Sequence, residues 1–126
     1  ILSSRAPIGY LAIAEVPISV NLGIIAMVPN GKLPSSYLLF WTEANMDTIL
    51  RNANGSTFQE ISKSNFRPMT MVVPPKEIVS RFNAFVEPLL VKAVNNLKEI
   101  STLAAIRDDL LPKLLSGEIR VPMEAD

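Results

Sequence analysis

The stretch that follows the Pro74-Pro75 pair constrains this 126-residue chain more than any other feature. From residue 76 to about residue 111, apolar residues recur three, four or seven positions apart, as they do along one face of an α-helix. A helix of about 36 residues is about 54 Å long, and a domain of this size cannot cover it. We therefore expect the uncovered apolar stripe to pack on a second helix. The residues expected at that contact are Ile78, Phe82, Phe85, Leu89, Val94 and Leu97.

Two prolines, Pro88 and Pro112, are expected to affect the course of this helix. Pro88 lies inside it, where a proline removes one backbone hydrogen bond at a cost of about 3 kcal/mol, so we expect a kink or a shift of the apolar stripe there. Pro112 and Gly117 are expected to end the helix. Residues 118–121 then form a final short extended segment.

The region before the double proline has the pattern of a small mixed half-domain. Residues 11–16, 24–28 and 68–73 are short, apolar runs bounded by glycine or proline, which predicts three strands. Ser35 or Ser36 is expected to cap a helix that ends near Asn54-Gly55. Residues 56–66 show no sustained period. Apolar residues expected on the inner face of that helix are Tyr37, Leu38, Trp41, Ala44 and Ile49.

These elements predict an α+β fold in three parts. Residues 1–75 form the half-domain, residues 76–121 form the long, coiled-coil-forming helix with its extension, and residues 122–126 form a tail. The chain lacks an initiating Met and a charged leader, so we expect it to be a piece entered in the middle of a longer protein. No apolar run has the length of a membrane span, and we expect a soluble, cytoplasmic protein.

The amino-acid composition limits the kinds of binding site and catalytic group that this chain can form. Lysine plus arginine and aspartate plus glutamate both number 12, so no global positive field attracts a polyanion, and any nucleic-acid contact must come from individually placed residues. The chain has no cysteine and no histidine, which excludes disulfides, thiolate zinc sites and imidazole bases. Asp108 and Asp109 point about 100° apart on a helix and cannot share a metal. We expect a chain without catalytic activity, metal or cofactor.

Several motifs, taken together and in order, resemble the specificity subunits of type I restriction enzymes. They span nearly the whole chain. The motifs are Ser3-Ser4-Arg5-Ala6-Pro7-Ile8-Gly9, Gly55-Ser56-Thr57-Phe58 with Ile61-Ser62-Lys63-Ser64, Pro74-Pro75, and Leu110-Leu111-Pro112-Lys113-Leu114-Leu115-Ser116-Gly117-Glu118-Ile119. Where the family has Asn-Gln-Gly this chain has Asn21-Leu22-Gly23, which keeps the turn but loses any contact made by the glutamine.

The resemblance implies a function and a set of partners. Subunits of this family have two target recognition domains held apart by two long antiparallel helices, and each domain reads half of a split DNA sequence. This chain resembles the C-terminal part of one such domain with the helix that follows. Methylation and cleavage, with S-adenosylmethionine and with ATP and magnesium, then belong to modification and restriction subunits, the former docked on the helices. The second helix comes from the same longer chain or from a second copy.

Candidate DNA contacts follow from side-chain chemistry, each with a plainer alternative. Ser3, Ser4 and Arg5 offer two hydroxyls and a guanidinium, suited to a phosphate or a guanine edge, or else they satisfy a turn and an ion pair. Ser56 and Thr57 after Gly55 can hold a phosphate, although the residues alone favour a helix cap and turn. The full set is Ser3, Ser4, Arg5, Asn21, Ser56, Thr57, Gln59, Lys63 and Arg67, the last two of which are otherwise ordinary solvated charges.

Two further alternatives concern the apolar residues. Tyr37, Phe40 and Trp41 have the composition of a base-stacking platform, but their helical spacing favours a buried core. The neutral charge and the long apolar stripe also fit a helical oligomerisation or adaptor protein without nucleic-acid contact. The hypothesis we carry forward is recognition of double-stranded DNA, whose target sequence depends on loop conformations that the sequence does not specify.

Overall fold

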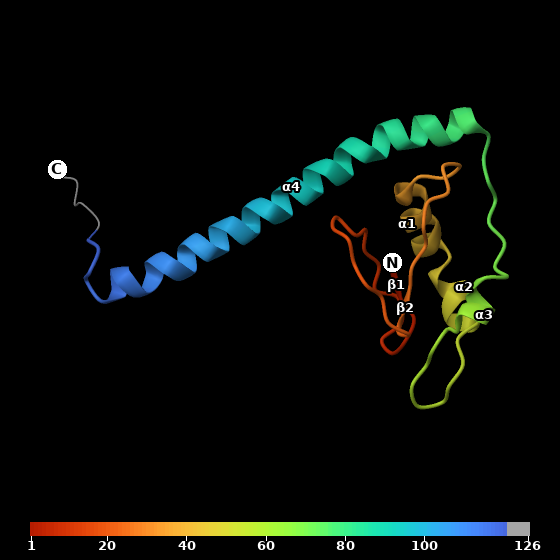
Figure 1. Cartoon of the computed structure of the whole chain (residues 1–126), viewed down its shortest axis with the longest axis horizontal. Coiled ribbons are helices and arrows are strands. Elements are labelled where there is room, and N and C mark those ends of the chain that lie inside the picture. Colours follow the sequence, from red (N-terminus) through yellow and green to blue (C-terminus); the bar gives the residue numbers. More distant parts are fainter. Residues whose placement is uncertain (121–126) are drawn as a thin grey trace. The chain divides into compact units, whose positions relative to one another are not determined.

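The computed structural model describes residues 1–120 and confirms the predicted α+β class (Figure 1). It contains a two-stranded sheet, three short helices and one long helix. The chain divides into two compact units, Ile1–Val86 and a second that begins at Glu87. In chain order the elements are β1 (Leu2–Ser3), β2 (Ile24–Ile25), α1 (Ser35–Ala44), α2 (Met46–Arg51), α3 (Lys63–Phe66) and α4 (Lys76–Leu115).

The sheet is smaller than the sequence predicts. β1 pairs antiparallel with β2, Leu2 facing Ile25 and Ser3 facing Ile24, so the predicted strand over 24–28 is confirmed only at its first two residues. The strand predicted over 11–16 is wrong: Leu11 forms a single bridge with Leu2, and in the described part of the chain residues 13–16 pair with no strand. An apolar run becomes a strand only where a partner edge is available to bond its backbone.

The strand predicted over 68–73 is also wrong. This segment has irregular backbone. The Met69 amide donates to the carbonyl of Phe66 at 3.1 Å, and the Tyr37 hydroxyl donates to the carbonyl of Val72 at 2.9 Å. Pro68 and the Pro74-Pro75 pair bracket it, and each proline removes an amide that a ladder would use. The segment therefore serves as the connection between α3 and α4.

The core of the first unit joins segments that are distant in sequence. Leu2, Ile25, Ile49 and Ile61 are buried together, and they come from β1, β2, α2 and the segment before α3. Burial of aliphatic side chains is the main favourable term in holding such segments together, at roughly 25 cal/mol per Å². The partly buried residues around this cluster are Ile8, Leu11, Met27, Met46, Ala53, Phe66 and Met69.

The single helix predicted from Ser35 to Asn54-Gly55 is divided into α1 and α2. Asn45 lies at the junction with φ −104° and ψ 13°, and its side-chain amide donates to the carbonyl of Trp41 at 2.8 Å. The predicted serine cap is wrong because Pro34 occupies the cap position, and Ser36 is buried. α2 ends at Arg51, before Asn54-Gly55, and α3, which the sequence did not predict, begins after Ser62, whose hydroxyl accepts from the Asn65 amide.

The inner face of α1 differs from the predicted stripe in three positions: Ala44 is exposed, whereas Ser36 and Thr42 are buried. The aromatic residues pack only in part as the core interpretation predicts, because Tyr37 and Trp41 are half-buried and Phe40 is 41% exposed. Tyr37 and Phe40 both contact Phe82 of α4 edge to face, with ring centroids 5.8 and 6.1 Å apart. The Ser36 hydroxyl donates to the side-chain oxygen of Asn83 at 2.8 Å. These contacts attach the first turns of α4 to α1.

The long helix is confirmed, and it is longer than predicted. α4 has 40 residues, or about 60 Å at 1.5 Å per residue, and it continues through both Pro88 and Pro112. The prediction that Pro112 ends it is wrong: a proline loses its own amide bond, but the Pro112 carbonyl still accepts from the Ser116 amide at 3.0 Å. The kink at Pro88 stays a prediction.

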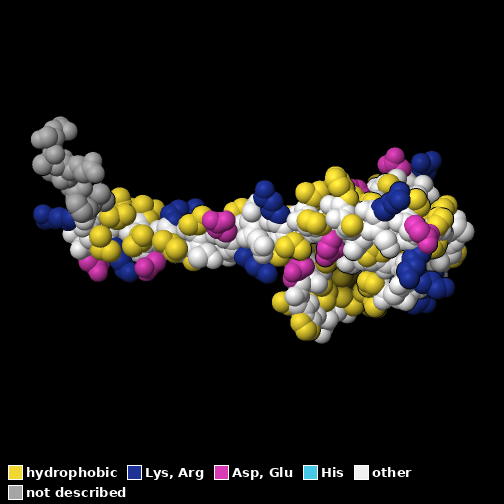
Figure 2. Space-filling model, turned by 90° about the horizontal axis from the view of Figure 1, so that it is seen from above, with side chains coloured by type: hydrophobic (Ala, Val, Ile, Leu, Met, Phe, Trp, Pro, Cys, Tyr) yellow, Lys and Arg dark blue, Asp and Glu magenta, His cyan; other side chains and the backbone are white. Residues whose placement is uncertain are grey.

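The helix ends one turn later, where Gly117 takes φ +76°, a conformation that favours glycine. Residues 118–120 are irregular, while Val121 and the predicted tail 122–126 lie outside the described residues. Hydrophobic side chains, interspersed with charged ones, lie exposed along α4 (Figure 2). Among the described residues, no helix combines the length and the apolar character needed to cross a membrane.

Truncation of Val86 tests whether the first part of α4 is buried as described. Val86 is 7% exposed, whereas Val91, on the same helix, is 51% exposed. We expect Val86→Ala to lower the free energy of unfolding by about 2 kcal/mol, and Val91→Ala by less than about 0.5 kcal/mol. Urea unfolding followed by the fluorescence of Trp41, the single tryptophan, measures both. Equal effects of the two substitutions would contradict the packing described.

Candidate nucleic-acid interface

The N-terminal serines are occupied by the local fold. The Ser3 hydroxyl donates to the carbonyl of Pro7 and accepts from the amide of Tyr10, both at 2.9 Å. Ser4 is 1% exposed, its amide donates to the Gly23 carbonyl and its carbonyl accepts from the Ile61 amide. Ser3 therefore satisfies a turn, which is the alternative left open by the sequence. Ser4 instead bonds segments that are distant in sequence, and its buried side chain is unavailable to a ligand.

Arg5 lies at the surface beside the serines. Its Nε pairs with Oε2 of Glu60 at 3.1 Å, and its aliphatic carbons lie next to Gly23. An exposed pair of this kind contributes about 0–1 kcal/mol, because solvent screens it and holding two long side chains costs entropy. The guanidinium has further N–H donors beyond Nε. The pair thus orients Arg5 and leaves other N–H groups of the guanidinium free to donate to a phosphate or a base edge.

Asn21 has a structural role in the turn that the sequence predicts. Its side-chain oxygen accepts from the Gly23 amide at 2.9 Å, and its carbonyl accepts from the Ile24 amide at 3.3 Å. A side chain at Gly23 would press against Asn21 and Arg5. Asn21 therefore fixes the turn against which Arg5 rests, and its amide oxygen is already bonded.

The Gly-Ser-Thr-Phe motif forms the tip of a short hairpin. Asn54 and Glu60 exchange two backbone hydrogen bonds of 2.8 Å, and the residues between them are exposed. Gly55 has φ +109°, and a Cβ there would collide with the carbonyl of Phe58. The predicted helix cap at Gly55 is therefore absent, while the turn is present. Ser56 and Thr57 offer two exposed hydroxyls on a loop whose ends are held by the backbone pair.

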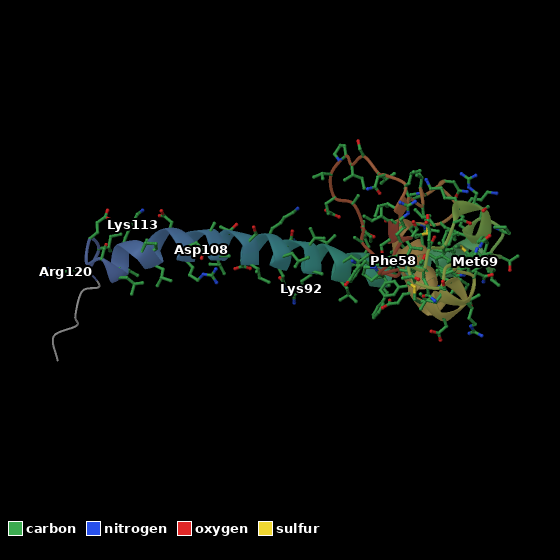
Figure 3. All side chains as sticks on the ribbon, turned by 90° about the horizontal axis from the view of Figure 1, so that it is seen from below. Phe58, Met69, Lys92, Asp108, Lys113 and Arg120 are labelled. Carbon is green, nitrogen blue, oxygen red and sulfur yellow. The ribbon has the colours of Figure 1, made fainter. Side chains whose placement is uncertain are left out.

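Phe58 is a candidate contact that residue chemistry alone did not select. Its side chain is 79% exposed at the hairpin tip (Figure 3), which is unusual for a large aromatic residue. The signal available in the sequence is an aromatic residue in a short polar loop led by glycine. Phe58, Gln59 and Glu60 line one open groove with Arg5 and Ala6. The structure thus brings Arg5 and Gln59 together with the hairpin tip.

The two remaining basic residues line a different hollow. Lys63 begins α3 and Arg67 follows its last residue, and both are exposed. The hollow that they line is mostly apolar, with Trp41, Phe66 and Met69 among its walls. Apart from Ser3, Ser4 and Asn21, the predicted DNA-contact residues therefore divide into a hairpin group and an α3 group. Within residues 1–120, no cluster of three or more potential metal ligands occurs.

The residues predicted to contact a partner helix also divide into two groups. Phe82 packs on α1, as described above, and is therefore engaged within the first unit. Ile78, Phe85, Leu89 and Leu97 are exposed, and Val94 is half-buried. Lys92, Asp108 and Lys113, labelled in Figure 3, show how charged side chains alternate with the apolar ones along α4. Most of the predicted partner face is thus open.

Comparison with known proteins identifies relatives. A family model described as the type I restriction modification DNA specificity domain matches residues 1–102. The specificity subunit of the type I restriction enzyme MjaIX from Methanocaldococcus jannaschii is 40% identical over 73 residues, which cover 58% of this chain and 17% of that protein. The HindI specificity subunit from Haemophilus influenzae is 29% identical over 121 residues, covering 94% of this chain and 26% of that protein.

The chain thus spans about a quarter or less of the length of these two relatives, at 17% and 26%. No solved structure matches it.

Replacing Gly55 by alanine tests whether the hairpin requires glycine. The new Cβ would collide with the loop's own backbone, so we expect the Asn54–Glu60 pair to open and the amides of both residues to lose protection from hydrogen exchange. Gly31→Ala is the matched control, because Gly31 also has positive φ but no neighbouring atom within 4 Å. Unchanged protection in Gly55→Ala, measured by NMR, would rule out the described loop geometry.

Proposed function

This chain belongs to the family of type I restriction-modification DNA specificity domains, and from that membership we propose that it takes part in sequence-specific recognition of double-stranded DNA. It does so as part of a specificity subunit that directs methylation and cleavage by partner subunits. The observation that carries the proposal is the hairpin closed by the backbone hydrogen bonds between Asn54 and Glu60. It holds its tip residues, Ser56, Thr57 and Phe58, in solvent beside the guanidinium of Arg5.

The chemistry of this surface suits a duplex. Hydroxyl and guanidinium groups donate hydrogen bonds to phosphate oxygens and so fix the register of a protein on DNA. In the major groove, arginine pairs with the O6 and N7 atoms of guanine, and glutamine with the N6 and N7 atoms of adenine. Arg5 and Gln59 are therefore the proposed base readers, while Ser56 and Thr57 are the proposed phosphate contacts. Lys63 and Arg67 extend the contact from α3.

The same proposal gives each part of the chain a role. Residues 1–75 form the C-terminal part of a target recognition domain, and residues 76–121 form the spacer helix with its extension. Because the sequence contains neither histidine nor cysteine, we assign methyl transfer and cleavage to the modification and restriction subunits and none to this chain. The exposed side of α4 packs on a second helix, from the same longer polypeptide or from a second copy.

A second candidate function is a helical adaptor that binds no nucleic acid. The exposed apolar stripe of α4 and the balanced charge, 12 basic against 12 acidic residues, favour it. Titration with a random-sequence duplex library separates the two functions. We expect enrichment of one preferred sequence and an affinity that falls steeply with salt, because binding to phosphates releases counterions. Binding without sequence preference, or none at low salt, would favour the adaptor.

Substitution of Arg5 tests the assignment of the base reader. We expect Arg5→Ala to weaken binding of the preferred duplex on the order of tenfold and to relax the preference at one base pair, as loss of a bidentate base contact does. Arg51→Ala is the charge-matched control, since Arg51 lies exposed on α2 and does not line the groove. Competition shift assays measure both variants, and an equal loss for the two would refute a specific role for Arg5.

A further inference from the structure

We infer that the ring of Phe58 contacts the 5-methyl group of a thymine in the major groove of DNA, which makes Phe58 a specificity-determining residue. The inference deepens the proposed function and rests on it, because it names a base that the hairpin tip reads. Three observations carry it: the exposure of the Phe58 ring, the polar groups around that ring, and the backbone pairing that holds the hairpin beside Arg5.

Phe58 is exposed without belonging to an apolar surface. Its side chain is 79% exposed, and it lies outside the buried core cluster and the side chains packed around that cluster. Among the residues that line the groove with it, Ala6 alone is apolar. Surfaces that bind other proteins are contiguous apolar patches. A single ring among polar groups instead suits a ligand that presents one apolar group among hydrogen-bond donors and acceptors.

The major-groove edge of an A·T base pair has this composition. Thymine presents its O4 acceptor and its 5-methyl group there, and adenine presents an N7 acceptor and an N6 donor. Phenylalanine is among the side chains that contact the thymine methyl group, and glutamine pairs with N6 and N7 of adenine. Phe58 and Gln59 are consecutive, and both line the groove. Together they match the apolar and the polar groups of A·T pairs.

Backbone pairing holds the hairpin tip close to Arg5. Glu60 pairs antiparallel with Asn54 across the hairpin and also with Arg5 of the N-terminal segment. Paired strands lie about 4.8 Å apart, so the Arg5 backbone runs directly beside that arm of the hairpin. Successive bases along one DNA strand lie about 3.4 Å apart. The thymine that Phe58 contacts is therefore expected within about three base pairs of the position that Arg5 reads.

The width of the hairpin and the charge beside it favour the major groove. The major groove is about 12 Å wide and admits a two-stranded ribbon, whereas the minor groove is about 6 Å wide. Apolar side chains that wedge between base pairs enter from the minor groove, which would have to accept both arms of the hairpin. The ion pair between Arg5 and Glu60 has no net charge, so this groove attracts phosphate weakly. These residues therefore suit base edges in the major groove.

Replacement of thymine by deoxyuridine tests the contact, because uracil lacks the 5-methyl group of thymine and keeps its pairing with adenine. The duplex preferred in the library selection is made with each thymine replaced in turn, and each duplex is titrated with the full chain in competition shift assays. We expect one replacement, close to the position that Arg5 reads, to weaken binding on the order of threefold, as exposure of one methyl-sized group does.

Phe58→Ala completes a double-mutant cycle with the same two duplexes. We expect this variant to bind the thymine and the deoxyuridine duplex with equal affinity, because the group that distinguishes them is gone. Its hairpin should stay closed, since the bonds between Asn54 and Glu60 join backbone groups, and the exchange of these two amides measures this. Phe85→Ala is the matched control, because Phe85 is 73% exposed on α4 and does not line the groove. It should keep the full difference between the duplexes.

Unchanged affinity after every deoxyuridine replacement would overturn the inference, as would a preferred duplex with no A·T pair near the position that Arg5 reads. If Phe58→Ala weakens binding but keeps the difference between the duplexes, the ring stacks between base pairs, and the thymine contact is rejected. Loss of amide protection in this variant would assign Phe58 to the hairpin fold and reject it too. Sequence-specific binding that persists in these cases leaves the proposed function standing. A library that enriches no sequence rejects the proposed function, and the thymine contact with it.

Discussion

The packing of α1 on the first turns of α4 is the contact on which the other features of this chain depend. Phe82 lies between the buried Val79 and Val86 and meets the rings of Tyr37 and Phe40, while Ser36 bonds Asn83. This contact covers the apolar seam of α4 over its first turns and leaves the rest uncovered. Because exposed apolar surface is unfavourable in water, the remaining seam requires a partner, and the covered part limits where that partner can bind.

The recognition surface is built on the same first unit, and it depends on backbone geometry more than on charge. Two hydrogen bonds between Asn54 and Glu60 hold the hairpin, and Gly55 allows its tip to turn. The Arg5–Glu60 pair sets the guanidinium beside that tip. In a chain of balanced charge, such placement has to supply what a general positive field supplies in more basic proteins. The proposed reader is therefore a loop with few polar groups, closed by two backbone hydrogen bonds.

Periodicity predicted the long helix well because its signal extends over many turns, and the α+β class followed from this helix together with the strand at residues 24–25. The strands predicted over 11–16 and 68–73 are absent from the structure. An apolar run forms a ladder only if a partner edge lies beside it, and the local sequence does not show whether one does. Among the site residues, residue type shows the hydroxyl of Ser4 but not its burial, and it gives no sign that Phe58 is exposed, since aromatic residues are ordinarily buried. The type of a residue does not show whether tertiary contacts will bury its side chain.

Hydrogen exchange along α4 in dilute solution tests the central claim, that α1 covers the first part of the apolar stripe of α4 and leaves the rest open. We expect amides of residues 79–86 to be protected, because their packing partner belongs to the same chain. Amides of residues 89–114 should exchange rapidly, since a helix without tertiary packing is marginal in water. Equal protection of the two stretches would contradict the account.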